Sequence, residues 1–241
     1  MTQRINVERK LNFRGSAESN PNVFGNIWND KVIYFDDFLG DVLRDEWTPS
    51  GNNGGTEAIT AGTGGTVTLT TTSTSEDRSI LAGGLNWYPA QNPAFFARVQ
   101  VDNIATVGIN IGLTDAVTEA NDHLAFEIST ATIVDTCTDG VSWVFDTDAT
   151  AKYWHYCNTK DSTQGGTSYG VAPVNATYAV LGVSIDSDGN ATFWYNGQQV
   201  GYKASAVTST TPLCPFMGVI ARTSAARILT VDYVALFQDR S

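Results

Sequence analysis

The amino-acid sequence predicts an all-β protein in which many short strands form a sandwich or barrel. The 241 residues are rich in Thr, Ser, Asn and Gly, and only 16% are charged, whereas about a quarter is usual in soluble proteins. Apolar and polar residues alternate with a period of two in several segments, which is the pattern of strands with one buried face. Turn-forming pairs such as Asn196-Gly197 separate these segments. No segment keeps the periodicity of a helix.

The alternating segments give the expected order of the strands. Between residues 106 and 113, apolar residues from Val107 to Leu113 alternate with small or polar ones. The segment 228–237 is apolar on nearly both faces, so we expect it in the centre of a sheet. About a dozen strands are expected in all, and the clearest lie at 32–35, 66–70, 94–101, 106–113, 123–129, 178–185, 191–195 and 228–237.

Residues 1–31 differ from the rest of the chain in their pattern of apolar residues. We interpret residues 32–241 as one β-sandwich domain. The apolar residues of this first segment come in small, separated groups, which cannot build a core of their own. The pattern predicts an extended N-terminal arm whose apolar side chains dock on a neighbouring molecule. The expected anchors are Ile5, Val7, Leu11, Phe13, Phe24 and Trp28.

The net charge of −11 argues against nucleic acid and against an anionic membrane surface as partners. The first twenty residues carry four basic and two acidic residues, so the arm is slightly basic and the body is acidic. The N-terminal residues lack the apolar stretch of a signal peptide, and no run approaches the length of a membrane span. We therefore expect synthesis in a cytoplasm.

The order of the motifs resembles a known family. A strand that ends in Asp186-Ser187-Asp188-Gly189-Asn190 is followed by an aromatic strand and the Asn196-Gly197 turn, which resembles concanavalin A-like and laminin G-like jelly rolls. Segments 95–99 and 109–113 resemble the paired central strands of that family, and 229–234 resembles its last strand. The opening 34–38, followed by Trp47, resembles such domains in bacteriophage structural proteins. The resemblance implies a concanavalin A-like jelly-roll β-sandwich with an extended N-terminal arm.

Catalytic groups are sparse in the sequence. Some members of this family are glucanases, which need two carboxylates on either side of the scissile bond. The nearest strand, 123–129, offers Glu127 alone, and we expect Glu127 to form a cross-strand pair with Arg98. The chain has no Gly-x-Ser-x-Gly elbow, and neither His123 nor His155 lies in a triad context. The sequence predicts that the protein is not an enzyme.

Metal binding and disulfides have weak signals. Asp186, Asp188 and Asn190 have a spacing similar to that of calcium ligands, but the loop lacks the later bidentate Glu. Asp and Asn also favour hairpin turns, so we predict a turn and no cofactor, with calcium as the alternative. The three cysteines, Cys137, Cys157 and Cys214, do not form a disulfide framework. We expect buried thiols, and a Cys137–Cys157 bridge is left open.

Aromatic residues crowd the segment 143–156. If the segment alternates as a strand does, these rings cannot all face the core, so some must face outward. Exposed rings stack on sugar faces or contact another subunit. The candidates for carbohydrate binding are Trp143, Tyr153, Trp154 and Tyr156.

Two functional hypotheses follow. The first is a non-enzymatic head decoration or cement protein on the outside of a bacteriophage virion, as the resemblance implies. Its partners would be the major capsid protein, neighbouring copies of itself, or both, and it would form a homo-oligomer. The alternative is a carbohydrate-binding, lectin-like module of a tail or fibre that recognises a host-surface glycan.

Overall fold

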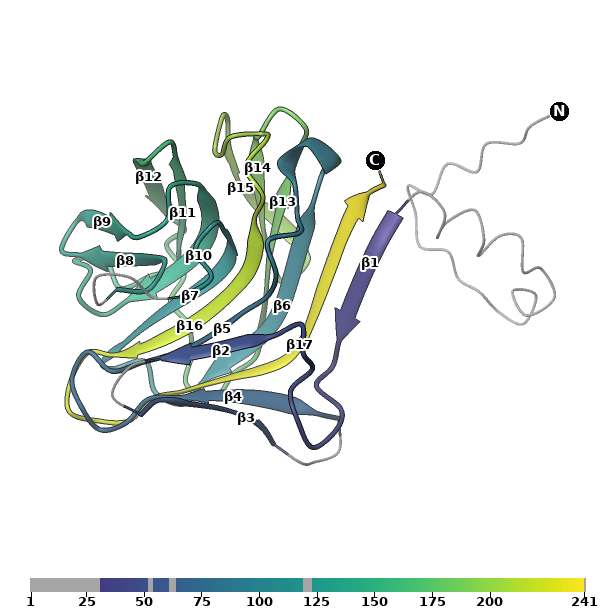
Figure 1. Ribbon diagram of the computed structural model, residues 1–241. Helices are drawn as coiled ribbons and strands as arrows, with labels where there is room; N and C mark the ends of the chain where they lie inside the picture. The colour runs from purple at the N-terminus through teal and green to yellow at the C-terminus, as the bar shows by residue number, and fades with distance from the viewer. Residues whose placement is uncertain (1–30, 52–53, 61–63, 119–122, 241) are drawn as a thin grey trace, which may run out of the picture.

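The computed structural model describes residues 31–51, 54–60, 64–118 and 123–240. These residues form the strands β1 to β17 and one 3₁₀ helix, η2 (Pro89–Gln91) (Figure 1). Within the described part of the chain, no helix is both long and apolar enough to cross a membrane. The predicted anchors Ile5, Val7, Leu11, Phe13, Phe24 and Trp28 lie outside the described residues.

The first of two large sheets has eight strands. Its order is β15-β14-β13-β6-β17-β4-β3, and β1 pairs with the C-terminal half of β17 (Figure 1). The strands are β1 (Lys31–Asp36), β3 (Thr56–Thr60), β4 (Thr66–Thr70), β6 (Ala94–Val101), β13 (Ala179–Ile185), β14 (Ala191–Tyr195), β15 (Gln198–Lys203) and β17 (Ile228–Asp239). The central position that we predicted for the last strand is confirmed, because β17 pairs with β6 on one side and with β4 and β1 on the other.

The second large sheet has seven antiparallel strands in the order β12-β11-β10-β7-β16-β5-β2. The strands are β2 (Thr48–Gly51), β5 (Arg78–Ala82), β7 (Val107–Thr114), β10 (Gly140–Asp146), β11 (His155–Lys160), β12 (Thr163–Ser168) and β16 (Cys214–Ala221). The two sheets confirm the predicted β-sandwich. The expected pairing of segments 95–99 and 109–113 is wrong, because β6 and β7 belong to opposite sheets and face each other across the core.

The main core lies between the two sheets. Alternate residues point into it, such as Phe95 of β6 and Ile111 of β7. Trp143 of β10 lies within an aromatic cluster, where its ring makes edge contacts with the rings of Trp154 and Phe193. The indole Nε1 of Trp143 donates a hydrogen bond of 2.9 Å to the Gly182 carbonyl of the opposite sheet. This bond joins the two layers through the middle of the core.

A second apolar cluster covers the outer face of the seven-stranded sheet. The segment 123–139 crosses this face and contains a small hairpin of β8 (Phe126–Ser129) and β9 (Thr132–Asp135) (Figure 1). Its apolar residues pack on side chains that point outward from the sheet. The buried members of this cluster are Ile80, Ala82, Leu124, Ala125, Phe126, Ile128, Cys137, Val144, Ala149, Cys157, Cys214, Phe216 and Ile220. The strands β7, β10 and β16 are therefore buried on both faces.

The predicted turn between β14 and β15 is also present. Asn196 has φ = 49° and Gly197 has φ = +80°, which are the positive values that a two-residue hairpin turn of this kind requires. The two residues join strands that pair with each other. A local signal of two residues is thus sufficient to place this hairpin.

We predict that Trp143→Phe lowers the free energy of unfolding by about 2–3 kcal/mol, because it removes the hydrogen bond to Gly182 and leaves a cavity in the core. The matched control, Tyr153→Phe, changes an exposed aromatic residue and should stay within about 0.5 kcal/mol of the wild type. Urea unfolding measures both. Equal effects of the two substitutions would contradict the central place of Trp143.

Candidate functional site

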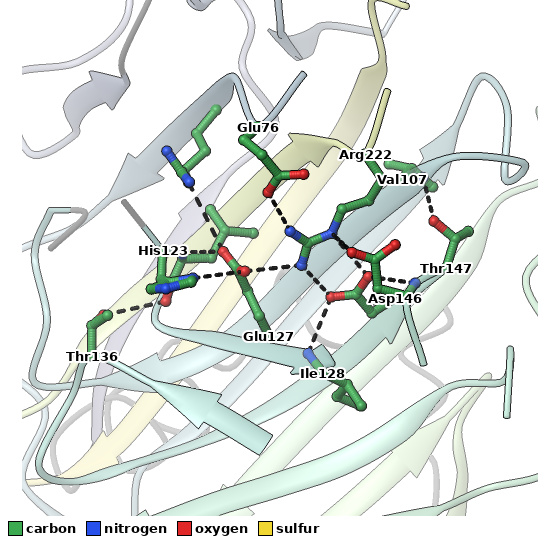
Figure 2. A network of polar contacts seen from close by, with 12 residues as sticks. Glu76, Val107, His123, Glu127, Ile128, Thr136, Asp146, Thr147 and Arg222 are labelled. Atoms are coloured by element: carbon green, nitrogen blue, oxygen red, sulfur yellow. Dashed lines mark hydrogen bonds and ion pairs between the residues drawn. The ribbon is translucent and has the colours of Figure 1, made fainter. Parts of the chain in front are cut away.

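A buried network of charges lies at one end of the seven-stranded sheet (Figure 2). Arg222 follows β16, Asp146 ends β10, and Glu127 lies in β8. The guanidinium of Arg222 donates to both carboxylate oxygens of Asp146, from Nε at 3.0 Å and from Nη2 at 2.5 Å. Nη2 also donates to Oε2 of Glu127 at 2.9 Å. One cation therefore joins the sheet to the hairpin that covers it.

Four further ionisable side chains surround this centre. Nη1 of Arg222 donates to Oε2 of Glu76 at 2.6 Å, and Nε lies 3.6 Å from the Asp148 carboxylate. On the other side, Nδ1 of His123 lies 3.0 Å from Oε2 of Glu127. Nε of Arg78 lies 3.9 Å from Oε1 of the same carboxylate. His123, Glu76 and Asp148 are partly exposed, so they form the outer edge of the network.

The central carboxylates are shielded from solvent. Glu127 is 3% exposed and Asp146 is 0% exposed. Burial raises the pKa of Glu127, but the charge of Arg222 and hydrogen bonds from His123, Leu124 and Arg222 outweigh this effect and hold the pKa below its ordinary value. Burial raises the pKa of Asp146, against the opposing hydrogen bonds and charge of Arg222. Both carboxylates are thus shielded from solvent and share the guanidinium of Arg222.

This geometry does not suit a glycosidase. A general acid or base must be within reach of the proton that it transfers, whereas Glu127 and Asp146 are buried and share one guanidinium. The same carboxylates also accept hydrogen bonds from backbone N–H groups. The N–H of Leu124 donates to Glu127 at 2.7 Å, and the N–H of Ile128 donates to Asp146 at 3.1 Å. The network instead holds the hairpin of β8 and β9 against the seven-stranded sheet.

The predicted pair of Glu127 with Arg98 is wrong. Arg98 lies on the outer face of the eight-stranded sheet, where Nη1 binds the Asp232 carboxylate and the guanidinium lies 4.0 Å above the Tyr178 ring. Glu127 lies in β8, which is outside the two large sheets and covers the opposite side of the sandwich. The two residues therefore have no common face.

The aromatic residues proposed for sugar binding lie mostly in the core. Trp143 and Trp154 are 0% and 2% exposed, and Tyr156 packs against the same core. Tyr153 alone among the four is exposed, at 43%. Trp154 and Tyr156, two residues apart, both point toward the core, and Tyr153 beside them points outward, as alternation along an extended segment requires. The four residues do not form a shared exposed surface.

The candidate calcium residues form a hairpin turn. Oδ1 of Asp186 accepts hydrogen bonds from the backbone N–H groups of Asp188 at 3.0 Å and Asn190 at 2.9 Å. The Asn190 amide donates to the other oxygen of Asp186 at 2.9 Å. The Asp186 carboxylate thus stabilises the turn by accepting these three hydrogen bonds. In the described ranges, no group of three or more His, Cys, Asp or Glu side chains is arranged to hold a metal ion.

The three cysteines are free and buried. Cys137 and Cys157 therefore do not form the disulfide that the sequence left open. Burial raises the pKa of Cys214 to about 12, and it also raises the pKa of the Cys137 and Cys157 thiols well above the ordinary value. A thiol with such a pKa is a poor nucleophile at neutral pH. These side chains act as small apolar core residues.

An open cleft lies where β1 and the end of β17 meet β5 and β16 of the other sheet. Its volume is about 240 Å³, and we call it the Trp47–Trp87 cleft. It is lined by Val32, Ile33, Tyr34, Glu46, Trp47, Gly83, Gly84, Asn86, Trp87, Pro215, Leu236 and Gln238. Glu46 and Asn86 are exposed, and the tryptophans form its inner wall. No local sequence pattern indicates this cleft, because its aromatic residues come from three separate segments.

Asp36 holds the aromatic residues of the cleft in position. This buried carboxylate accepts hydrogen bonds from Trp47 Nε1 at 2.8 Å, from the Tyr34 hydroxyl at 3.2 Å and from the Phe38 backbone N–H at 2.9 Å. Burial, followed by the charge of Asp36, raises the pKa of Tyr34 well above its ordinary value. The phenol therefore stays neutral, and the polar edges of both rings point toward Asp36 rather than into the cleft.

Comparisons with known proteins identify the fold. No family model matches the chain, and no curated protein matches its sequence. Among solved structures, the carbohydrate recognition domain of Emp47p is similar, with a TM-score of 0.62 and 8% identity over 88% of this chain and 98% of that chain. The laminarinase from Rhodothermus marinus has a TM-score of 0.60 and 12% identity over 86% of this chain and 97% of that chain.

The Bacillus licheniformis beta-glucanase is a third similar structure, with a TM-score of 0.57 and 9% identity over 86% of this chain and 98% of that chain. At such low identities these similarities show the fold alone. Together with the two antiparallel sheets, they establish that the chain is a concanavalin A-like jelly-roll β-sandwich. They leave its function to be argued from its own residues.

We predict that Glu127→Gln lowers the free energy of unfolding at pH 7 by about 1–3 kcal/mol, because it removes a buried charge-assisted contact. The folded pKa of Glu127 lies below the value of 4.5 for the free group, so its contribution is complete above about pH 4.5 and falls as the pH drops through the folded pKa. The difference between variant and wild type should therefore shrink in acid. Urea unfolding at pH 7 and pH 3.5 measures it.

The control for this prediction is Glu46→Gln, which changes an exposed carboxylate and should shift the stability by less than about 0.5 kcal/mol at either pH. A loss of stability in Glu127→Gln that is constant between pH 7 and pH 3.5 would show that the pKa of Glu127 is not lowered in the folded protein.

Proposed function

We propose that this protein binds carbohydrate without chemical conversion and that the Trp47–Trp87 cleft is the binding site. The observation that carries the proposal is the make-up of this cleft. An open hollow of about 240 Å³ combines an aromatic wall with the exposed side chains of Glu46 and Asn86. Ligand sites commonly combine apolar walls with a few polar groups that set orientation.

The chemistry of the cleft suits a sugar ring. The apolar C–H face of a sugar can pack on Tyr34, Trp47 and Trp87, since aromatic side chains supply large and rigid contact surfaces. The carboxylate of Glu46 accepts hydrogen bonds from hydroxyl groups, and the Asn86 amide can donate or accept them. Because Asp36 binds the polar edges of Tyr34 and Trp47, these rings offer the ligand mainly apolar surface.

Binding rather than hydrolysis is supported by the two carboxylates on the covered face of the seven-stranded sheet. Glu127 and Asp146 are closed off by the segment above them and tied to Arg222. Within the cleft, Glu46 is the sole carboxylate among the lining residues, whereas most glycosidases use a pair. The similarity to the Emp47p carbohydrate recognition domain agrees with the proposal but supports only the fold by itself.

We predict that Glu46→Ala and Asn86→Ala each weaken sugar binding about five- to thirtyfold, which corresponds to the loss of one or two hydrogen bonds. Both side chains are exposed, so the fold should be kept. A glycan array selects the ligand, and isothermal titration calorimetry measures the affinities. Gln199→Ala on β15 is the control and should bind as the wild type does. Unchanged affinity in both cleft variants would reject this site.

Attachment to a virus particle remains a separate hypothesis from the sequence. Its anchors lie in residues 1–31, and the described residues do not test it. Its partners would be the major capsid protein or further copies of this chain, and its location the outside of the virion. A glycan on a host surface would be the ligand of the cleft if the protein belongs to a tail or fibre instead.

A chain that begins at Lys31 distinguishes the two functions. The cleft residues from Val32 onward are retained in it, so we predict unchanged sugar affinity by calorimetry. Attachment to capsids that lack the protein, measured by co-sedimentation, should be lost if the arm is the anchor. Full attachment of the shortened chain would show that residues 1–30 are not the anchor.

A further inference from the structure

A second pocket lies at the other open edge of the sandwich, where the edge strands β12 and β15 of the two sheets approach each other. Its volume is about 290 Å³, and we call it the Lys160–Lys203 pocket. All of its lining residues are polar: Asn158, Lys160, Asp161, Thr163, Gln164, Lys203 and Ser205. It differs in this respect from the Trp47–Trp87 cleft, whose wall is aromatic.

Polar side-chain atoms of the pocket from both sheets lie close to Gly165 of β12. A Cβ atom at Gly165 would lie 2.8 Å from Oδ1 of Asn158 and 3.0 Å from Nζ of Lys203. Asn158 is 5% exposed, and its amide nitrogen donates a hydrogen bond of 3.0 Å to the Ala206 carbonyl. This bond fixes the amide so that Oδ1 faces β12. The missing side chain at Gly165 is what leaves room for the lysine.

The two lysines differ in their partners from several other cations of this protein, which are bound to carboxylates. Lys31 is paired with Asp239, Arg98 with Asp232, and Arg222 with several carboxylates. Within the described part of the chain, neither Lys160 nor Lys203 forms an ion pair. Nζ of Lys160 donates to the Ser205 hydroxyl at 2.7 Å. Two ammonium groups thus line one pocket without a carboxylate partner.

One carboxylate also lines the pocket. Oδ1 of Asp161 accepts a hydrogen bond of 3.2 Å from the Thr208 hydroxyl outside the lining. Its charge limits the affinity for a simple anion, but its remaining acceptor sites suit hydroxyl groups. The pocket therefore combines two positive charges with groups that bind hydroxyls, namely Asp161, Asn158 and Gln164.

We propose that the Lys160–Lys203 pocket binds an acidic sugar residue, with the sugar carboxylate held by the two lysines and its hydroxyls by the neighbouring polar side chains. This inference rests on the proposed carbohydrate-binding function and specifies the charge class of the ligand. A charge-assisted hydrogen bond to a carboxylate is shorter and stronger than a neutral one. A sugar acid therefore gains over its neutral counterpart at this position.

The test compares two oligosaccharides that differ only at C6: cellotetraose and the β-1,4-linked tetramer of glucuronate. Isothermal titration calorimetry with the full-length protein should give an affinity for the acidic tetramer that is about tenfold higher, as expected for charge-assisted contacts. Lys160→Met and Lys203→Met should each remove most of this preference and leave cellotetraose binding unchanged. The control Lys152→Met changes an exposed lysine outside the pocket and should keep the preference.

Gly165→Ala separates the shape of the pocket from its charge. The added Cβ would displace Asn158 and Lys203 without changing the net charge, so the preference should fall as it does in the lysine variants. A preference that survives in Gly165→Ala and in both lysine variants would overturn the proposed site. Circular dichroism and thermal unfolding verify that each variant is folded.

The outcomes distinguish this inference from the proposed function. If cellotetraose binds with an affinity that depends on Glu46 and Asn86, and the acidic tetramer binds no better, the cleft stands and the acidic-sugar site falls. If the acidic tetramer requires the lysines and is insensitive to Glu46 and Asn86, the acidic-sugar site stands, and the dependence of cellotetraose binding on Glu46 and Asn86 decides on the cleft. No binding of either tetramer overturns the acidic-sugar site, and the glycan array then decides on the cleft.

Discussion

The buried guanidinium of Arg222 is the interaction on which the outer layer of the protein depends. Burial of an arginine is costly unless carboxylates and hydrogen bonds compensate it, and here the compensation comes from Asp146, Glu127 and Glu76. These three residues belong to β10, to the β8 hairpin and to the loop before β5. One side chain therefore fixes the ends of two strands of the sheet, and the segment that covers it, relative to one another (Figure 2).

This closed face determines where a ligand can bind. The segment 123–139 covers the outer face of the seven-stranded sheet, and β7, β10 and β16 are buried on both faces, so these strands offer no exposed surface to a ligand. The Trp47–Trp87 cleft and the Lys160–Lys203 pocket lie instead at the edges of the sandwich, where strands of the opposite sheets lie near each other. One edge supplies aromatic rings and the other supplies lysines, so the two positions are suited to different parts of a glycan.

The sequence predicts those parts of the fold that depend on local pattern. Alternation identifies the buried face of β6 and β13, and Asn196-Gly197 places a hairpin. Alternation does not identify neighbouring strands, which is why β6 and β7 were expected to pair although they lie in opposite sheets. Glu127 and Arg222 are 95 residues apart, and no local signal connects them. Trp47 and Trp87 lie at the end of a loop and beside a glycine pair, where periodicity gives no information about a shared cleft.

The fold alone does not decide between catalysis and binding, because glucanases and a carbohydrate recognition domain share it. The decision depends on whether a carboxylate can reach a substrate and change its protonation there. In this chain Arg222 stabilises the ionised form of Glu127 and occupies Asp146, and the hairpin above them excludes a sugar. The exposed carboxylate of Glu46 has an aromatic wall beside it but no second acid among the residues that line the cleft. Cleavage of a glycosidic bond generally needs two carboxylates, whereas one carboxylate beside aromatic rings can orient a hydroxyl group, and this difference is the reason why we propose binding for the cleft.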